Sequence, residues 1–248
     1  MSTAALTMRQ VRYNNKAFWR NPAAAFFTFA FPLMFLVIFN ALFGDAEFFV
    51  PGIAAFGIVS ASYSNLAMSM TFLREEGVLK RVRGTPLPPG SFLVARVVHA
   101  IFLAYILVAI MAIFGAVFYD VAIPTDTLPA FILAIGVEAA CFCALGLAVT
   151  ALIPNTDAAP AIVNALVIPT AFISDVWAPY DNAPAWLQAV ADFFPLKLAV
   201  DAIKCGFNPG DPICDGSAYQ WFDLGIVVAW GVFGLIAAIL RFRWEPRR

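Results

Sequence analysis

The sequence has little charge and almost no histidine. Charged residues make up 12% of its 248 residues, and there is a single histidine. Soluble proteins carry roughly 25% charged residues, about twice this share. Hydrophobic residues make up 62% of the chain. This composition excludes an ordinary soluble domain and indicates a protein embedded in a membrane.

The motifs of several enzyme classes are also missing. The sequence contains no G-x-x-x-x-G-K-[ST] run, the loop that cradles nucleotide phosphates, and no G-x-S-x-G nucleophile elbow. The single histidine, His99, excludes an H-E-x-x-H zinc motif. Cys141 and Cys143 lie two residues apart in an apolar run, where packing is the expected role. We therefore expect no enzyme activity, metal site or bound cofactor in this chain alone.

The basic residues are confined to a few short segments. Thirteen of the fifteen Lys and Arg residues fall into three groups: Arg9, Arg12, Lys16 and Arg20; Arg74, Lys80, Arg81, Arg83 and Arg96; and Arg241, Arg243, Arg247 and Arg248. Cytoplasmic loops of membrane proteins collect Lys and Arg, so all three segments are expected on the cytoplasmic side. Eleven of the sixteen acidic residues then fall on the outer side. The pattern predicts that both termini are cytoplasmic.

Long apolar runs separate these segments. A helix needs about 20 apolar residues to cross the ~30 Å hydrocarbon core of a bilayer. The predicted spans are residues 23–43, 48–73, 97–119, 128–153, 158–174 and 221–240. Six crossings return the chain to its starting side, in agreement with the charge pattern. The predicted fold is an all-α membrane domain over residues 23–248, with six transmembrane helices.

Residues 1–22 are predicted to form a cytoplasmic amphipathic helix at the membrane interface. Arg9, Arg12, Lys16 and Arg20 step by three, four and four residues, which places them on one stripe of a helix. Such a helix lies along the anionic inner leaflet and binds membrane lipids. The alternative is a charge cluster that only sets topology. On the outer side, residues 185–194 and 196–207 have helical periodicity but are too short and too acidic to span, so interfacial helices are expected.

Two parts of the chain carry a resemblance to a known family. The segment from Leu73 to Pro89 reads LREEGVLKRVRGTPLPP. It resembles the R-E-x-G-T-L-x-R-L-x-x-T-P-L signature of type-2 ABC (ATP-binding cassette) exporter permeases, particularly their drug-resistance branch. The second part runs from Ile153 to Lys204 and resembles the same family's N-x-x-x-A, F-L-S-G, L-P-x-W-L and P-L-x-x-x-x-D-x-x-R sequences. This chain has Asp175 where a glycine is usual and Lys204 where an arginine is usual.

The resemblance implies a coupling helix between the second and third spans. Six residues of this segment would couple it to a separate ATP-binding subunit: Arg74, Glu75, Glu76, Gly77, Lys80 and Arg81. A short rigid helix tied to two spans can transmit movement of a soluble partner into the membrane. The alternative is a solvated loop that only obeys the positive-inside rule. Two copies of the partner would bind ATP and Mg, and a second copy of this chain or a related permease would complete the pathway.

The second and fifth spans are expected to line that pathway. The resemblance implies this role, and both spans carry polar residues. The predicted pathway residues are Ser60, Ser64, Asn65, Asn164 and Thr170. Pro160 and Pro169 interrupt the hydrogen-bond ladder of the fifth span. The alternative is that these small polar residues hold helices together.

Three further residues are predicted to matter. Glu138 lies near the middle of the fourth span, where a charge costs about 2.5–3.5 kcal/mol on insertion scales. Glu138 either forms a hydrogen bond between helices or takes part in the translocation pathway. Cys205 and Cys214 lie in the outer loop, with turn residues between them. The outer face is oxidising, so we expect a disulfide, with two free thiols as the alternative.

The sequence thus predicts the membrane-spanning permease of an ATP-driven exporter. The resemblance favours a hydrophobic or amphipathic substrate such as a drug or natural product, as in multidrug efflux and antibiotic resistance. The expected location is a bacterial plasma membrane, and no nucleic acid partner is expected. One alternative is an exporter of lipids or lipid-linked polysaccharide. Another is a secondary carrier, which should show paired intramembrane charges or an internal repeat.

Overall fold

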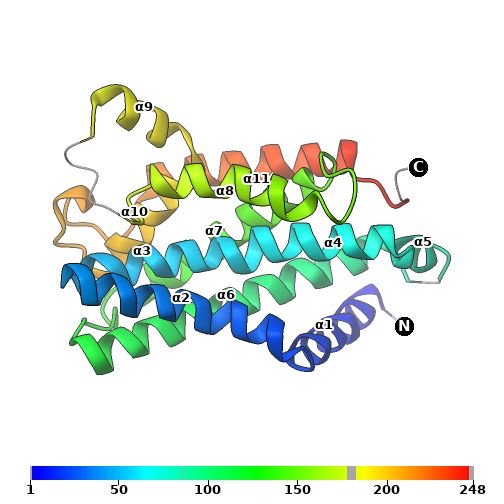
Figure 1. Ribbon diagram of the computed structural model, residues 1–248, viewed down its shortest axis with the longest axis horizontal. Helices are drawn as coiled ribbons and strands as arrows, with labels where there is room; N and C mark the ends of the chain where they lie inside the picture. Colours follow the sequence, from blue (N-terminus) through cyan, green and yellow to red (C-terminus); the bar gives the residue numbers. More distant parts are fainter. Residues whose placement is uncertain (1, 86, 178–182, 246–248) are drawn as a thin grey trace.

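The computed structural model describes residues 2–85, 87–177 and 183–245. Pro86 and Pro179, which belong to the family-like sequences, lie outside these residues. Within them the chain is helical and has no strand (Figure 1). The elements are α1 (Thr3–Trp19), α2 (Pro22–Phe43), α3 (Ala46–Val59), η1 (Ser60–Ser64), α4 (Asn65–Glu75), α5 (Val78–Arg83), α6 (Pro89–Tyr119), α7 (Leu128–Val149), α8 (Ala159–Phe172), α9 (Ala185–Phe193), α10 (Pro195–Phe207), η2 (Pro212–Cys214) and α11 (Trp221–Arg241).

Five helices are long and apolar enough to cross a membrane. These are α2, the continuous helix formed by α3, η1 and α4, and then α6, α7 and α11. The all-α, multi-pass prediction is confirmed. The fifth predicted span coincides with α8, which is apolar but has only 14 residues. At about 1.5 Å per residue α8 is shorter than the ~30 Å hydrocarbon core, so the sixth crossing stays a prediction.

The core of the bundle lies around α3 and α7. Most of the apolar window of α3–α4 is buried, whereas α2 and α11 bury little of theirs. Large apolar side chains such as Phe27, Leu42 and Ile239 are exposed along α2 and α11. Exposed apolar surface on this scale fits contact with lipid tails.

The two ends of the bundle carry different elements. The three predicted cytoplasmic segments lie together, because α1, α5 and the end of α11 share one end of the bundle (Figure 1). At the opposite end lie α9, the η2 loop and the α2–α3 junction (Figure 1). The grouping agrees with the sidedness predicted from the basic residues.

Close helix packing fixes the position of α7. A Cβ atom at Gly146 would lie 2.8 Å from the Tyr63 carbonyl oxygen, and one at Gly234 would lie 2.9 Å from the Leu145 backbone nitrogen. Only glycine allows these backbones to approach so closely. As a result α7 is held directly against η1 on one side and against α11 on another.

The outer helices differ in part from the expectation. Both occur close to the predicted boundaries, but α10 is almost wholly buried and packs against α11, α3 and α7. Its buried Lys197 forms an ion pair with Asp201 at 2.6 Å, one helical turn away. Burial raises the pKa of Asp201, and the charge of Lys197 opposes that shift. Pairing its charges lets α10 sit inside the bundle, where the sequence pattern indicated an interfacial helix.

Candidate functional site

The loop between the second and third spans consists of a turn and a short helix. The predicted charged segment does not form one helix, because α4 ends at Glu75 and Gly77 adopts a left-handed conformation with φ +71°. Glycine takes this conformation without steric cost and commonly ends helices. A new six-residue helix, α5, begins at Val78. Gly77 therefore sets the direction of α5 relative to the second span.

One face of α5 is anchored and the other is basic. Leu79 is fully buried and belongs to an apolar cluster with residues of α4, α6, α7 and α11. Lys80, Arg81 and Arg83 are exposed, as is Glu76 in the preceding turn. The helix thus presents a cationic surface at the predicted cytoplasmic end while its apolar side is held in the bundle.

Arg74 has a different position from the other predicted coupling residues. Its side chain is only 1% exposed. The guanidinium donates from Nη1 to the Thr150 carbonyl at 2.8 Å and from Nη2 to the Ile153 carbonyl at 2.8 Å. Its Nε donates to the Glu75 carboxylate at 2.9 Å. Arg74 therefore braces the end of the second span against the C-terminal end of α7, whose free carbonyls attract a cation.

The loop whose carbonyls bind Arg74 also forms part of the wall of a groove in the bundle. The groove has a volume of about 620 Å³ and lies among α7, α8, α11 and the start of α10. Ala151 and Leu152, between the two carbonyls bound by Arg74, form part of its wall. The charged loop and the groove are thus joined through one buried side chain.

The groove is mainly apolar with a few polar groups. The Tyr63 hydroxyl is buried and has no hydrogen-bond partner among the residues that the structure describes. Thr170 donates to the carbonyls of Leu166 and Val167 within its own helix. Arg241, the last residue of α11, also lines the groove. Apolar walls with sparse polar groups are typical of sites that bind hydrophobic ligands.

The predicted pathway residues do not converge on one site. Thr170 lines the groove, and Asn164 is exposed on another face of α8. Ser60 and Ser64 are half-buried and lie one turn apart on the second span. Asn65 instead faces a separate small cavity beneath α1. Ser60, Ser64 and Asn164 are at least partly exposed outside the groove and this cavity.

A π-helical segment interrupts the second span at these serines. Residues Ser60–Ser64 form η1, within which the buried Ser62 donates to the Ile58 carbonyl at 2.5 Å. Such segments occur frequently at functional sites. The spacing of apolar residues in the sequence does not predict a π-helical segment. The one feature of the sequence that marks this position is its cluster of serines. Tyr63, which lines the groove, was likewise not among the predicted pathway residues.

Glu138 lies inside the bundle and not against lipid. It is 1% exposed, and neither carboxylate oxygen has a hydrogen-bond partner within the described part of the chain. Its position on the buried face of α7 is compatible with either of the two predicted roles.

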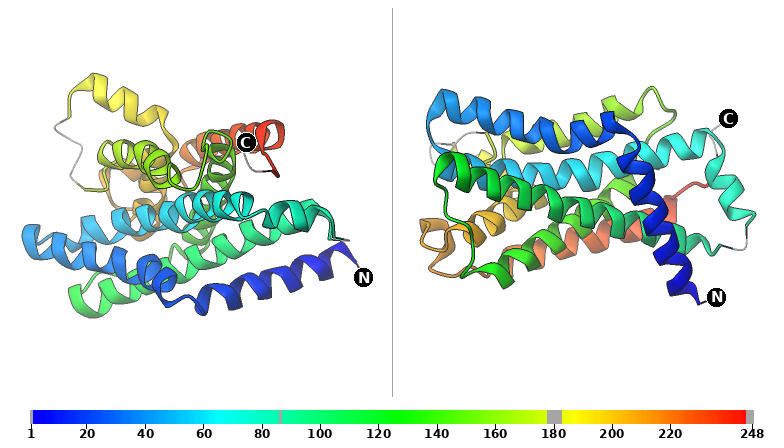
Figure 2. Two further views of the ribbon diagram at one scale, coloured as in Figure 1. Left: turned by 45° about the vertical axis from the view of Figure 1, so that its right-hand side comes forward. Right: turned by 90° about the horizontal axis from the view of Figure 1, so that it is seen from below.

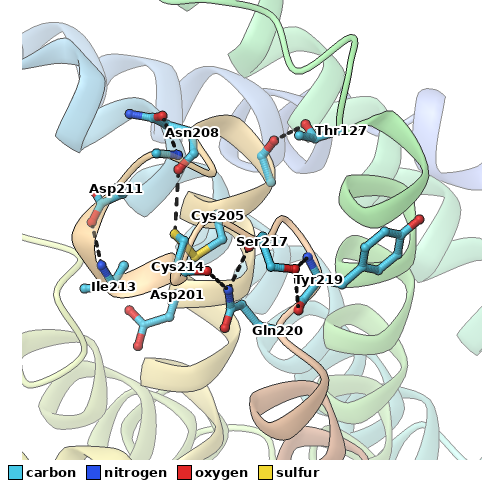
Figure 3. Close-up of a disulfide and its surroundings, with 12 residues drawn as sticks. Thr127, Asp201, Cys205, Asn208, Asp211, Ile213, Cys214, Ser217, Tyr219 and Gln220 are labelled. Carbon is cyan, nitrogen blue, oxygen red and sulfur yellow. Dashed lines mark hydrogen bonds between the residues drawn. A yellow bond between two sulfur atoms is a disulfide. The ribbon is translucent and has the colours of Figure 1, made fainter.

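The loop between α10 and α11 is closed by a disulfide and is hydrogen-bonded to the residue that precedes α11. Cys205 at the end of α10 forms a disulfide with Cys214 (Figure 3). The Gln220 side chain donates to the Cys214 carbonyl at 3.0 Å, which ties this loop to the start of α11 (Figure 3). The linkage holds the α10–α11 connection compact at the outer end of the bundle.

The two residues that depart from the family pattern contact each other. Asp175 takes a left-handed backbone conformation, φ +60°, at the position where a glycine is usual. Its carboxylate accepts a hydrogen bond from the ammonium of Lys204. The same ammonium lies 4.0 Å from the centroid of the Phe48 ring. The departures are therefore complementary, because the aspartate supplies the charge that the buried lysine requires.

Comparison with known proteins identifies the class. Residues 3–207 match the ABC-2 type transporter family, and this chain belongs to that family. It is 26% identical over 233 residues to a proposed transport permease, ycf38, of Cyanophora paradoxa, covering 84% of this chain and 78% of the relative. It is 25% identical over 239 residues to ycf38 of Porphyra purpurea, covering 90% of this chain and 79% of the relative. A third similar protein is the proposed transport permease YvfS of Bacillus subtilis, 23% identical over 198 residues and covering 79% of this chain and 78% of the relative.

The family and the fold together define a membrane permease of an ABC transporter. The family implies in general that such a permease works with an ATP-binding subunit. The all-helical bundle places this chain in the membrane, as the composition predicted.

Proposed function

We propose that this chain is the non-catalytic permease subunit of an ATP-driven exporter for a hydrophobic or amphipathic small molecule. Two copies, or one copy and a related permease, form the translocation pathway in the plasma membrane. Two separate subunits bind ATP and Mg and dock against α5. Drug or natural-product export, in the manner of the drug-resistance branch, is the favoured activity.

The observation that carries this proposal is the link between α5 and the groove. The exposed cations of α5 offer a surface to an acidic partner, while Leu79 and Arg74 fix the neighbouring backbone to the bundle. A displacement of α5 passes through the end of α4 and Arg74 to the loop at Ala151 and Leu152. ATP-driven closure of the partner would in this way reshape the groove.

The groove supports the assignment of the cargo class. Its volume of about 620 Å³ lies within the range of small-molecule sites, roughly 300–1,000 Å³. The cargo's apolar part packs against the groove walls, and Thr170, which lines the groove, offers a polar contact. The cargo then passes along the surfaces that carry Ser60, Ser64 and Asn164, where the second permease copy completes the pathway.

A lipid cargo is the second candidate. The observation that favours it is Arg241 at the cytoplasmic end of the groove, where it could pair with the anionic headgroup of a lipid whose acyl chain fills the groove. Stimulation of ATP hydrolysis by lipids, without stimulation by hydrophobic drugs, would favour this candidate. Membership of an ABC family argues against a secondary carrier.

The cargo site can be tested with two neighbouring substitutions on α11. Ile236 lines the groove and is 51% exposed, whereas Leu235 is 50% exposed and lines a second apolar groove on the α6 side. We expect Ile236→Trp to reduce ATP-dependent uptake of a fluorescent amphipathic dye by inverted vesicles at least severalfold, and Leu235→Trp to leave it near wild type. Equal transport by both variants, or loss only with Leu235→Trp, would refute the groove assignment.

The docking site can be tested by charge reversal. The double variant Lys80→Glu, Arg81→Glu should lose binding of the ATP-binding subunit and the associated transport. Arg243 is equally exposed at the same end of the bundle, so Arg243→Glu serves as the matched control. Normal binding of the ATP-binding subunit by the double variant would refute the assignment of α5 as its docking site.

A further inference from the structure

A small cavity lies beneath the N-terminal helix, away from the groove and from α5. Its volume is about 120 Å³, and α1, the η1–α4 region and α6 line it. Figure 2 shows α1 crossing the end of the bundle against α6. A water molecule needs roughly 10–15 Å³ of such space, so the cavity has room for a polyatomic ion.

Three residues that line the cavity carry a buried polar atom without a partner. The Asn14 amide nitrogen, the Arg96 Nε and the His99 Nε2 are buried and make no hydrogen bond to any described residue. Asn14 is 4% exposed and His99 is 8% exposed. Native proteins rarely leave buried polar groups unsatisfied, and an unseen ion or water is a common reason when they do.

Two of the unsatisfied groups are donors, and the third is a donor in one of its tautomers. The Asn14 side-chain oxygen already accepts a hydrogen bond from Gln10 at 3.2 Å, so only its NH₂ group remains for the cavity. A guanidinium can only donate, and His99 Nε2 donates in the tautomer that carries its proton there. The requirement is therefore for an acceptor with several lone pairs.

The cavity also lacks a negative charge. Its lining, as far as the structure describes it, contains no Asp or Glu, and the Arg96 guanidinium lies over the face of the Phe92 ring, 5.5 Å from its centroid. Water could satisfy the donors but could not neutralise Arg96. An anion does both, and phosphate matches the guanidinium in geometry.

We propose that this cavity binds a phosphate group, held by Arg96, Asn14 and His99. The group belongs either to an anionic phospholipid of the inner leaflet or to free inorganic phosphate. The exposed basic residues of α1 (Arg9, Arg12, Lys16 and Arg20) attract anionic lipids to the same end of the bundle, next to the cavity. The bound phosphate fixes α1 against α6, whatever cargo the transporter carries.

The test uses the full chain in a maltoside detergent and a buffer without phosphate. Thermal unfolding and native mass spectrometry are measured with added dioleoyl phosphatidylglycerol, with dioleoylglycerol, which has the same chains and no phosphate, and with inorganic phosphate. We expect phosphatidylglycerol or inorganic phosphate, but not dioleoylglycerol, to bind and to raise the Tm. A response to the lipid alone identifies a headgroup site, and a response to inorganic phosphate identifies a site for the free ion.

Two variants and a control make the test specific. Arg96→Gln should weaken the binding at least about tenfold, because it removes a charge-assisted hydrogen bond. Asn14→Asp places a carboxylate beside Arg96, so it should raise the Tm without ligand and abolish the response to phosphate. Arg12→Gln removes an exposed charge from the same helix and should change the affinity less than twofold. No response in the wild type, or a wild-type response in both Arg96→Gln and Asn14→Asp, would overturn the proposal.

Discussion

Replacing Arg74 should both destabilise the protein and uncouple it. Arg74→Met keeps the length of the side chain but removes the charge and all three hydrogen bonds, including those to the Thr150 and Ile153 carbonyls. The site is buried, so water does not replace the lost donors. The loop before α8 then loses its attachment to the second span.

The size of the effect follows from these contacts. A hydrogen bond from a charged donor contributes about 1.5–3 kcal/mol, and two such bonds reach backbone carbonyls here. Removal of one partner from a buried charged arrangement costs about 3–5 kcal/mol, which is the value we expect. For a protein of this size the corresponding fall in Tm is roughly 6–20 °C.

Thermal unfolding of the purified chain measures this directly. Arg81→Met is the control, because Arg81 is exposed on α5 and its loss should change stability by about 0.5 kcal/mol or less. Arg74→Lys keeps the charge but not the fork of donors, so an intermediate Tm is expected. Measured below the unfolding temperature with the ATP-binding subunit, Arg74→Met should transport less cargo per ATP hydrolysed. A Tm within 2 °C of wild type, together with unchanged transport per ATP, would refute the role of Arg74 as a brace, because the fall expected from the loss of its bonds is at least roughly 6 °C.

Three other predictions concern the pathway and the outer loop. Ser64→Trp should block transport while assembly and basal ATP hydrolysis persist, whereas Ile113→Trp, on an exposed apolar site of α6, should transport normally; the reverse result would mark the serines as packing groups. Asp175→Ala should lower the Tm because it leaves Lys204 buried and unpaired, and adding Lys204→Met should restore part of the loss; strictly additive losses would exclude the pairing. Mass spectrometry of non-reduced peptides should recover the outer loop as one disulfide-linked species, and alkylation of both cysteines in oxidised protein would contradict it.

Much of the fold can be predicted from the composition and from the spacing of apolar and basic residues along the chain. Apolar runs and the segregation of Lys and Arg predict the long helices, the shared end of the basic segments and the short helices between α8 and α11. These signals are local, because each helix must satisfy its own backbone in a membrane. The burial of α10 within the bundle could not be predicted from these local signals. Its acidic and basic residues suggested contact with water. Lys197 is paired with Asp201 within α10, but the partner of Lys204 is Asp175, which comes from another part of the chain.

The sequence predicted which segments form the candidate site, but it did not predict the contacts that join them. The sequence marks the charged loop, yet gives no indication that Arg74 turns inward while Lys80 and Arg81 face outward. That division depends on Gly77, which ends one helix and starts another, and on the carbonyls of Thr150 and Ile153, far away in the sequence. The departures at Asp175 and Lys204 were visible singly, but their contact spans 29 residues and requires the folded outer loop.

Co-reconstitution of the chain with an ATP-binding subunit tests the central claim most directly. Uptake of a fluorescent amphipathic dye by inverted vesicles should require both proteins and hydrolysable ATP. It should disappear when the catalytic carboxylate of the ATP-binding subunit is replaced, and it should persist when the proton gradient is collapsed. Uptake by this chain alone, driven by the proton gradient and indifferent to ATP, would contradict the assignment as the permease of an ATP-driven exporter.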